Sequence, residues 1–281
     1  MIRDLKDYHI HPDYSMDAQG SIEEYCQKAL EIGLSEICFT PHYDTDPARK
    51  EIDAYMRVDG NLVKLTDEVV QKYIDEVHKA KDKYSALGLS VKVGLEVDYA
   101  VHIEEGLGRK LPQFGLDFCL GAIHCLDHIA ITSTHESEKY FRGKTAQQIC
   151  QEYFTVFEAA VSSGLFKTMA HLDGYKIYGI NFCGEKILTA HQGLVEPILE
   201  LMAQKGVGLE INTGSFRKGH RETSPGVDIL KMASRLGVKV NTLGSDAHQV
   251  KDLGKDLDVA QEFLRSIFGT AKCIQTKTPR V

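Results

Sequence analysis

The sequence predicts an α/β fold built from strand and helix units around one parallel sheet. Short β-branched or apolar runs recur along the chain, and longer amphipathic stretches separate them. The length of 281 residues fits a single β/α barrel, so we expect one domain over residues 1–281. Hydrophobic residues make up 43% of the chain and charged residues 26%, which is enough apolar side chain for a sizeable buried core.

Seven segments have the composition of buried strands, rich in Val, Ile, Leu and aromatic residues. In chain order they are residues 7–11 (DYHIH), 36–42 (EICFTPH), 91–98 (VKVGLEVD), 117–125 (DFCLGAIHC), 167–173 (KTMAHLD), 208–213 (GLEINT) and 239–246 (KVNTLGSD).

Helices are expected between these strands. The first has clear end signals, because Ser21 and Glu24 form a capping box and Gly33 follows the last apolar position. The other predicted helices are residues 65–87, 145–163, 194–204, 227–236 and 257–267, and the predicted loops are 45–61, 112–115 and 130–143.

The composition excludes several classes of protein. A formal net charge of -7 argues against a broad basic surface for nucleic acid, although bound cations would still make a local pocket attractive to a small anion. No apolar run is long enough to span a membrane, and the N-terminus lacks the apolar core of a signal peptide. Seven scattered cysteines without a CxxC pattern indicate reduced thiols, so we expect a cytoplasmic protein. They are Cys26, Cys38, Cys119, Cys125, Cys150, Cys183 and Cys273.

Metal-ligating residue types follow almost every predicted strand. In a β/α barrel the carboxyl ends of all strands meet at one rim, so side chains at these ends are expected to lie close together. The residues at these positions are His9, His11, His42, Glu96, His124, His171, Asp246 and His248.

The pattern His9-x-His11 has a specific use, because residues two apart on a strand face the same side and both imidazoles can reach one cation. Imidazole and carboxylate ligands without thiolates suit zinc, manganese or iron in a catalytic site. The set is too large for one tetrahedral ion, and a carboxylate such as Glu96 can bridge two ions. The sequence therefore predicts two or three divalent ions.

Seven motifs resemble, in order, those of the PHP (polymerase and histidinol phosphatase) phosphoesterase family: DYHIHPDYSMD, FTPH, GLEVD, GAIH, MAHLD, EINTG and GSDAH. The length and the segments GLEVDY and EINTGSFRKG are most similar to the stand-alone histidinol-phosphate phosphatases. The resemblance implies a distorted seven-stranded, TIM-like (β/α)7 barrel with a trinuclear metal site at its C-terminal rim, and hydrolysis of L-histidinol phosphate in histidine biosynthesis.

The same resemblance implies a ligand set for each ion. The first ion would take His9, His11, Glu96 and Asp246; the second Glu96, His124 and His171; the third Asp17, His42 and His248. We also expect catalytic roles for Asp17, Glu96, Asp246 and His248.

Water activated by the ions is expected to attack the phosphorus, since the chain has no GxSxG elbow and no P-loop that would indicate covalent catalysis. Arg217 is the candidate clamp for phosphate oxygens, with His220 near it in sequence. Lys176 is a second candidate, because the segment after His171 reads LDGYKIYG where the related phosphatases have an arginine-bearing segment.

Two alternative functions remain open on the sequence. One is a phosphoesterase of the same family that acts on another small ester, such as a nucleotide or sugar phosphate. The other is a non-catalytic metal-binding regulatory module, like the PHP domains attached to bacterial polymerases. The histidines without strand-end positions are expected to be solvent-exposed or capping, and Asp44 and Asp46 to be loop charges; these histidines are His78, His102, His128, His135 and His191.

Overall fold

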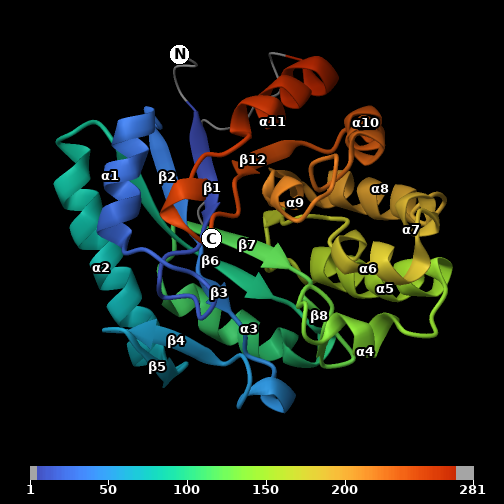
Figure 1. Cartoon of the computed structure of the whole chain (residues 1–281), viewed down its shortest axis with the longest axis horizontal. Helices are drawn as coiled ribbons and strands as arrows, with labels where there is room; N and C mark the ends of the chain where they lie inside the picture. The colour runs from blue at the N-terminus through green and yellow to red at the C-terminus, as the bar shows by residue number, and fades with distance from the viewer. Residues whose placement is uncertain (1–4, 270–281) are drawn as a thin grey trace.

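The computed structural model describes residues 5–269 and confirms the predicted α/β barrel (Figure 1). Seven parallel strands form a nearly closed sheet, and each lies within or next to a segment predicted to be a strand. In sheet order they are β1 (Lys6–Ile10), β2 (Glu36–Phe39), β6 (Ser90–Asp98), β7 (Phe118–Ala122), β10 (Thr168–Met169), β11 (Gly208–Asn212) and β12 (Val240–Gly244). Cys273 lies outside the described residues.

Several predicted strands are shorter than expected, most of all the fifth, in which only Thr168–Met169 of residues 167–173 form a strand. The second is interrupted at Pro41, which has no N–H to donate, and resumes as β3 (His42–Tyr43), which pairs with β6 so that His42 lies opposite Glu96. The fourth ends at Ala122, and the chain then turns into a small antiparallel hairpin of β8 (Cys125–Leu126) and β9 (Ile129–Ala130).

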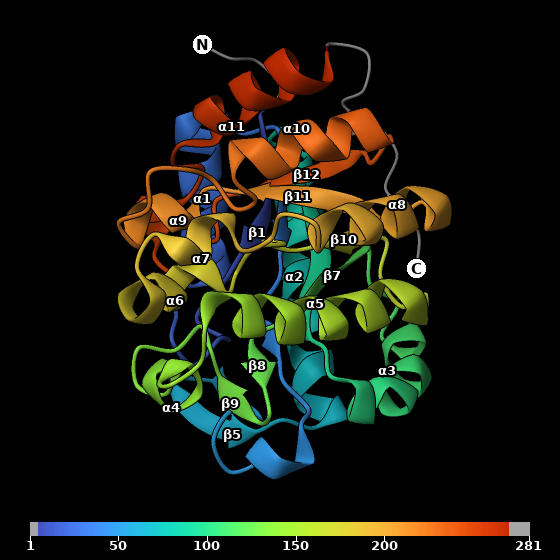
Figure 2. The ribbon, with the colours of Figure 1, turned by 90° about the vertical axis from the view of Figure 1, so that its right-hand side faces the viewer.

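The longer helices cover the outside of the sheet, and Figure 2 shows α5, α8, α10 and α11 along one side of the molecule. They are α1 (Ile22–Ile32), α2 (Asp67–Ser85), α5 (Ala146–Ser163), α8 (Val195–Lys205), α10 (Val227–Leu236) and α11 (Leu257–Phe263), which continues as a π-helix over Leu264–Phe268. The predicted capping box of α1 is present, and Gly33 ends the helix with a φ of 79°. Among the helices of residues 5–269, none has the length and apolarity needed to cross a membrane.

Several short elements were not predicted, because none has enough residues to show a period. They are α3 (Glu104–Lys110), α4 (Ser137–Phe141), α6 (Lys176–Cys183), α7 (Lys186–Thr189), α9 (Gly214–Arg217) and the 3-10 turns Pro47–Arg49, Val101–Ile103, Leu111–Gln113 and Val250–Asp252. The predicted loop 45–61 was wrong in part, since it contains β4 (Tyr55–Val58), which pairs with β5 (Asn61–Lys64). The dipeptide Asp59-Gly60, with a positive φ at both residues, is the hairpin signal that could have revealed it. The predicted loop 130–143 likewise contains α4.

The barrel is closed between its first and last strands by isolated contacts rather than by a ladder. Within residues 5–269, this β1/β12 seam has one bridge, Ile10 with Ala247. The fully buried carboxylate of Asp7 strengthens the seam, because it accepts hydrogen bonds from the backbone N–H of Ser245 at 2.9 Å and of Gly254 at 3.0 Å. Asp7 thus fixes the start of β1, and with it His9, against the segment that carries Asp246.

Replacing Asp7 with Ala should lower the free energy of unfolding by about 2–4 kcal/mol, because the buried N–H of Ser245 and the partly buried N–H of Gly254 lose their acceptor. Chemical denaturation monitored by circular dichroism measures this change. Asp75→Ala on α2 is the matched control, since this exposed aspartate accepts only from Gln71 and should stay within about 0.5 kcal/mol of the wild type. Equal losses in the two variants would contradict the role given to Asp7.

Candidate metal centre

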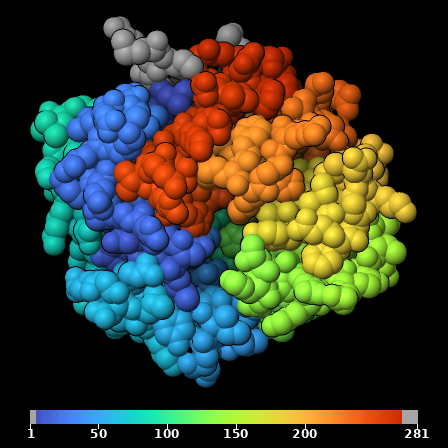
Figure 3. Space-filling view, in the orientation of Figure 1, coloured from blue at the N-terminus to red at the C-terminus, as the bar shows by residue number. Residues whose placement is uncertain are grey.

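An open pocket of about 260 Å³ lies at the carboxyl ends of the barrel strands. Figure 3 shows it as a hollow near the middle of the face, bordered by segments from distant parts of the sequence. Seven of the nine predicted ligands lie on its wall, while the remaining two, His9 and His11, are fully buried; the seven are Asp17, His42, Glu96, His124, His171, Asp246 and His248.

The carboxylate of Glu96 lies at the centre of this group. It projects from β6 and is 1% exposed. Its Oε2 lies 3.2 Å from His9 Nε2, 3.4 Å from His11 Nε2 and 3.0 Å from His42 Nδ1. Its Oε1 lies 3.2 Å from His124 Nε2 and 2.9 Å from His171 Nε2. One carboxylate therefore touches five imidazoles, three on one oxygen and two on the other.

Asp246 completes a compact group around Glu96 Oε2. Its Oδ1 is 3.6 Å from His9 Nε2 and 3.3 Å from His11 Nε2. Ligands bound to a tetrahedral zinc ion at 2.0–2.1 Å lie about 3.4 Å from one another, which matches these spacings. The ligand atoms of His9, His11 and Glu96 thus lie within 4.8 Å of one another, as the ligands of one ion do, and Asp246 Oδ1 contacts both imidazoles.

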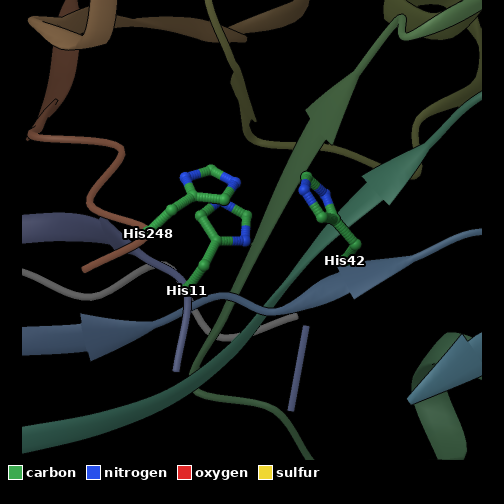
Figure 4. Close-up of side chains that lie close together, drawn as sticks. All are labelled: His11, His42 and His248. Atoms are coloured by element: carbon green, nitrogen blue, oxygen red, sulfur yellow. The ribbon is translucent and has the colours of Figure 1, made fainter. Parts of the chain in front are cut away.

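Asp17, His42 and His248 form another group at the outer edge of the site. Asp17 offers one oxygen to each imidazole, with Oδ1 3.7 Å from His42 Nε2 and Oδ2 3.4 Å from His248 Nε2. Figure 4 shows that the rings of His11 and His248 lie against each other and that the ring of His42 lies beside them. These histidines come from β3 and from the segments after β1 and β12.

Burial and charge indicate that these clusters fit divalent cations. Glu96 Oε2 and the Nε2 atoms of His9 and His11 are buried without a hydrogen-bond partner among the described residues, so their lone pairs have no other use. Burial alone would raise the pKa of Glu96, but the imidazoles, led by His9 and His124, lower it well below its usual range. Burial, reinforced by His248 and His42, lowers the pKa of His11. An ionised carboxylate and a neutral imidazole are the forms that bind metal.

Neighbouring side chains orient the imidazoles, and sequence reasoning missed most of them. Glu210 on β11 is fully buried and accepts from His9 Nδ1 at 2.7 Å, which leaves His9 Nε2 facing Glu96. The Nδ1 of His11 lies 3.2 Å from the hydroxyl of Ser15. Glu210 could have been found, since a charged residue within the buried run GLEIN needs a partner.

The backbone near the site is tightly constrained. A Cβ at Gly244 would lie 2.1 Å from Glu210 Oε1 and 2.5 Å from the Cβ of His9, so only glycine allows this contact. His171 and Asp246 have positive φ angles of 21° and 56°, which side-chain-bearing residues rarely adopt. Such strain is typical of positions that aim a side chain at a functional site.

The basic residues predicted to bind substrate are spread more widely. Arg217 lines a second, adjoining pocket and donates through Nη2 to the carbonyl oxygens of Ser245 and Asp246. Lys176 is absent from the walls of both pockets and pairs with the buried Asp173 at 3.0 Å. His220 is also absent from both walls, and its Nε2 contacts the carbonyl oxygen of Ile177.

Lys218, a neighbour of Arg217 that was ranked below it as a phosphate ligand, lines both pockets and is solvent-exposed. Among the remaining histidines, His78 and His135 are exposed as predicted. The prediction was wrong for His191, which is fully buried, with Nε2 2.9 Å from Asp228. A buried histidine on a short turn leaves no periodic signal in the sequence.

The chain is similar to known proteins over nearly its whole length. A family model described as PHP domain matches residues 7–214. A probable histidinol-phosphatase of Deinococcus radiodurans is 30% identical over 265 residues, which cover 94% of this chain and 94% of the relative. A histidinol-phosphatase of Bacillus subtilis is 26% identical over 269 residues, with coverage of 89% and 95%.

Two solved structures have the same fold. The histidinol phosphate phosphatase of Lactococcus lactis, complexed with Zn, L-histidinol and phosphate, superposes with a TM-score of 0.73 at 23% identity, covering 95% of this chain and 94% of the other. A putative histidinol phosphatase of Listeria monocytogenes gives a TM-score of 0.75 at 21% identity, covering 91% and 99%. Because the family model spans most of the chain and a relative shares 30% of its residues over 94% of the length, this protein belongs to the PHP domain family.

Proposed function

We propose that this protein is a metal-dependent phosphomonoesterase that hydrolyses L-histidinol phosphate to L-histidinol and phosphate. The observation that carries the proposal is the convergence of five imidazoles on the buried carboxylate of Glu96, beneath an open pocket. The substrate is supported by the curated relatives, which are named histidinol-phosphatases, and by the Lactococcus lactis structure with L-histidinol and phosphate. Free cysteines throughout the described residues support a reducing compartment, so we place the enzyme in the cytoplasm.

We propose that three divalent ions are held in the arrangement that the residue groups favour. His9, His11, Glu96 and Asp246 would hold the first; Glu96, His124 and His171 the second; Asp17, His42 and His248 the third. Zinc is supported by the Lactococcus lactis structure, and the same donors accept manganese or iron. When bound, divalent ions neutralise the charge of a phosphate ester and make water a stronger nucleophile at neutral pH.

Charge explains why a phosphate needs those ions. Five acidic residues line the pocket and would repel a phosphate dianion on their own: Asp17, Asp44, Asp53, Glu96 and Asp246. Lys218 offsets part of this charge from the pocket wall. Burial alone would raise the pKa of Asp246, but His9, His11 and His248, with a smaller effect of Lys218, lower it well below its usual range. We therefore propose that Lys218 contacts the phosphoryl oxygens.

The protein's own hydrogen bonds fix the protons at the site. Because Glu210 accepts from His9 Nδ1, the lone pair of that ring lies on Nε2. The Nδ1 of His248 lies 3.0 Å from the carbonyl oxygen of Asp246 and donates to it, so Nε2 faces Asp17. Arg217 donates to that same carbonyl oxygen and so positions Asp246 as well as lining the outer pocket. We assign catalytic roles to Asp17, Glu96, Asp246 and His248 on this basis.

Phosphate release from a panel of monoesters tests the substrate. With zinc- or manganese-loaded protein, kcat/KM for L-histidinol phosphate should exceed the values for a nucleoside monophosphate and a sugar phosphate by at least about tenfold. A preference for one of the other esters would favour a different phosphoesterase of the same family. Fully loaded protein that hydrolyses none of them would favour a regulatory metal-binding module.

Replacing Glu210 with Gln should weaken metal binding roughly 10- to 100-fold, because the neutral amide no longer holds the His9 ring as strongly. Competition with a chromogenic chelator measures the affinity, and circular dichroism checks the fold. Glu200→Gln, on the exposed side of α8, is the matched control and should bind metal like the wild type. A Glu210→Gln protein with unchanged affinity would rule out this supporting role.

Lys218→Ala and Lys176→Ala should have different effects. Loss of the Lys218 charge is expected to raise KM roughly ten- to a hundredfold with metal content intact. Loss of Lys176 leaves the buried Asp173 without its cation, so the free energy of unfolding should fall by about 3 kcal/mol while KM changes little. Steady-state kinetics and chemical denaturation of both variants distinguish a role in substrate binding from a role in stability. A raised KM in Lys176→Ala alone would assign phosphate binding to Lys176.

A further inference from the structure

A second cluster of metal-ligating residues lies outside the centre described above. It consists of Asp46 from the segment after β3, His102 from the 3-10 turn Val101–Ile103 and His128 from the turn between β8 and β9. Asp46 Oδ1 is 3.0 Å from His102 Nε2, and Asp46 Oδ2 is 2.5 Å from His128 Nδ1. The three ligand atoms all lie within 4.8 Å of one another, although the residues are up to 82 positions apart in sequence.

The cluster has one buried carboxylate, held in place by a backbone N–H, and two accessible imidazoles. The side chain of Asp46 is 8% exposed, whereas those of His102 and His128 are 45% and 49% exposed, so an ion could enter from solvent. The N–H of Ala48 donates to Asp46 Oδ1 at 2.9 Å and fixes the carboxylate. Burial alone would raise the pKa of Asp46, but hydrogen bonds from His128 and His102 lower it, which keeps the carboxylate ionised.

His128 occupies a position that the backbone would otherwise give to glycine. Asp127 and His128 have φ angles of 50° and 60°, so the hairpin turn has two consecutive left-handed residues. Glycine is strongly favoured at the second of these positions, and a side chain there costs about 1 kcal/mol. Arg49 Nη1 donates to the carbonyl oxygen of His128 at 2.7 Å and so holds the turn against the segment that carries Asp46. The strained residue is therefore the one that directs an imidazole at the carboxylate.

We propose that Asp46, His102 and His128 form a separate binding site for a divalent ion of the zinc type. Two imidazoles and one carboxylate are borderline donors that suit Zn²⁺ better than Mg²⁺ or Ca²⁺, with water completing the coordination. The ion joins three segments, two of which border the main pocket through Asp53 and Tyr55 on one side and Cys125 and Ala130 on the other. The bound ion thereby holds these two segments together at the mouth of the pocket. This site does not depend on the substrate proposed above.

The test measures zinc per chain by elemental analysis after equilibrium dialysis at one fixed free Zn²⁺ concentration. His128→Gly removes the imidazole and relieves the positive φ, so a loss of metal cannot be attributed to a strained turn. His102→Ala removes the other imidazole. His78→Ala is the matched control, because His78 is an exposed histidine on α2.

His128→Gly and His102→Ala should each contain about one zinc fewer than the wild type and His78→Ala, because two remaining ligands hold the ion poorly. Thermal denaturation should show that His128→Gly is folded. Equal zinc content in all four proteins would overturn the proposal and leave the cluster as two imidazoles hydrogen-bonded to Asp46. A loss of zinc shared by His78→Ala would overturn it as well.

Discussion

The buried carboxylate of Glu96 is the interaction around which the rest of the site is arranged. A carboxylate that is 1% exposed is costly unless cations or donors surround it, and here five imidazoles from different segments do so. Those imidazoles reach it only because the parallel strands end at one rim. Two of these imidazoles, His9 and His11, have a buried Nε2 without a hydrogen-bond partner among the described residues, so the arrangement that solvates Glu96 also prepares a site for cations.

The sequence predicted the part of this design that follows from topology. Histidine, aspartate and glutamate at strand ends must meet if the strands form a barrel, and the structure brings them together. It did not reveal Glu210, whose role depends on which face of β11 meets His9. It also favoured Lys176 over Lys218, because the geometry of the segments after β10 and β11 decides which side chain reaches the pocket, and that geometry has no sequence period. The β4–β5 hairpin was missed because strands of four residues each are too short to show a clear alternation of apolar and polar side chains.

An acidic protein can still offer an attractive site to an anion. The chain has a formal net charge of -7, and the carboxylates of five of its residues line the pocket. These carboxylates concentrate cations at the rim, and the cations reverse the local field that a phosphate meets. Lys218 adds a charge at the edge of the same pocket, where it is exposed and able to move toward a ligand. The overall charge therefore says little about the ligand, whereas the position of each charge says much.

The seam between β1 and β12 makes the candidate centre depend on segments that lie far apart in the sequence. His9 and His11 come from β1 and the residue after it, whereas Asp246 and His248 follow β12, and the carboxylate of Asp7 holds the two segments together. A fragment covering residues 5–212, which stops at the end of β11, would contain all five imidazoles that contact Glu96 but neither Asp246 nor His248. The complete geometry of the centre is therefore a property of the closed barrel and of no single strand.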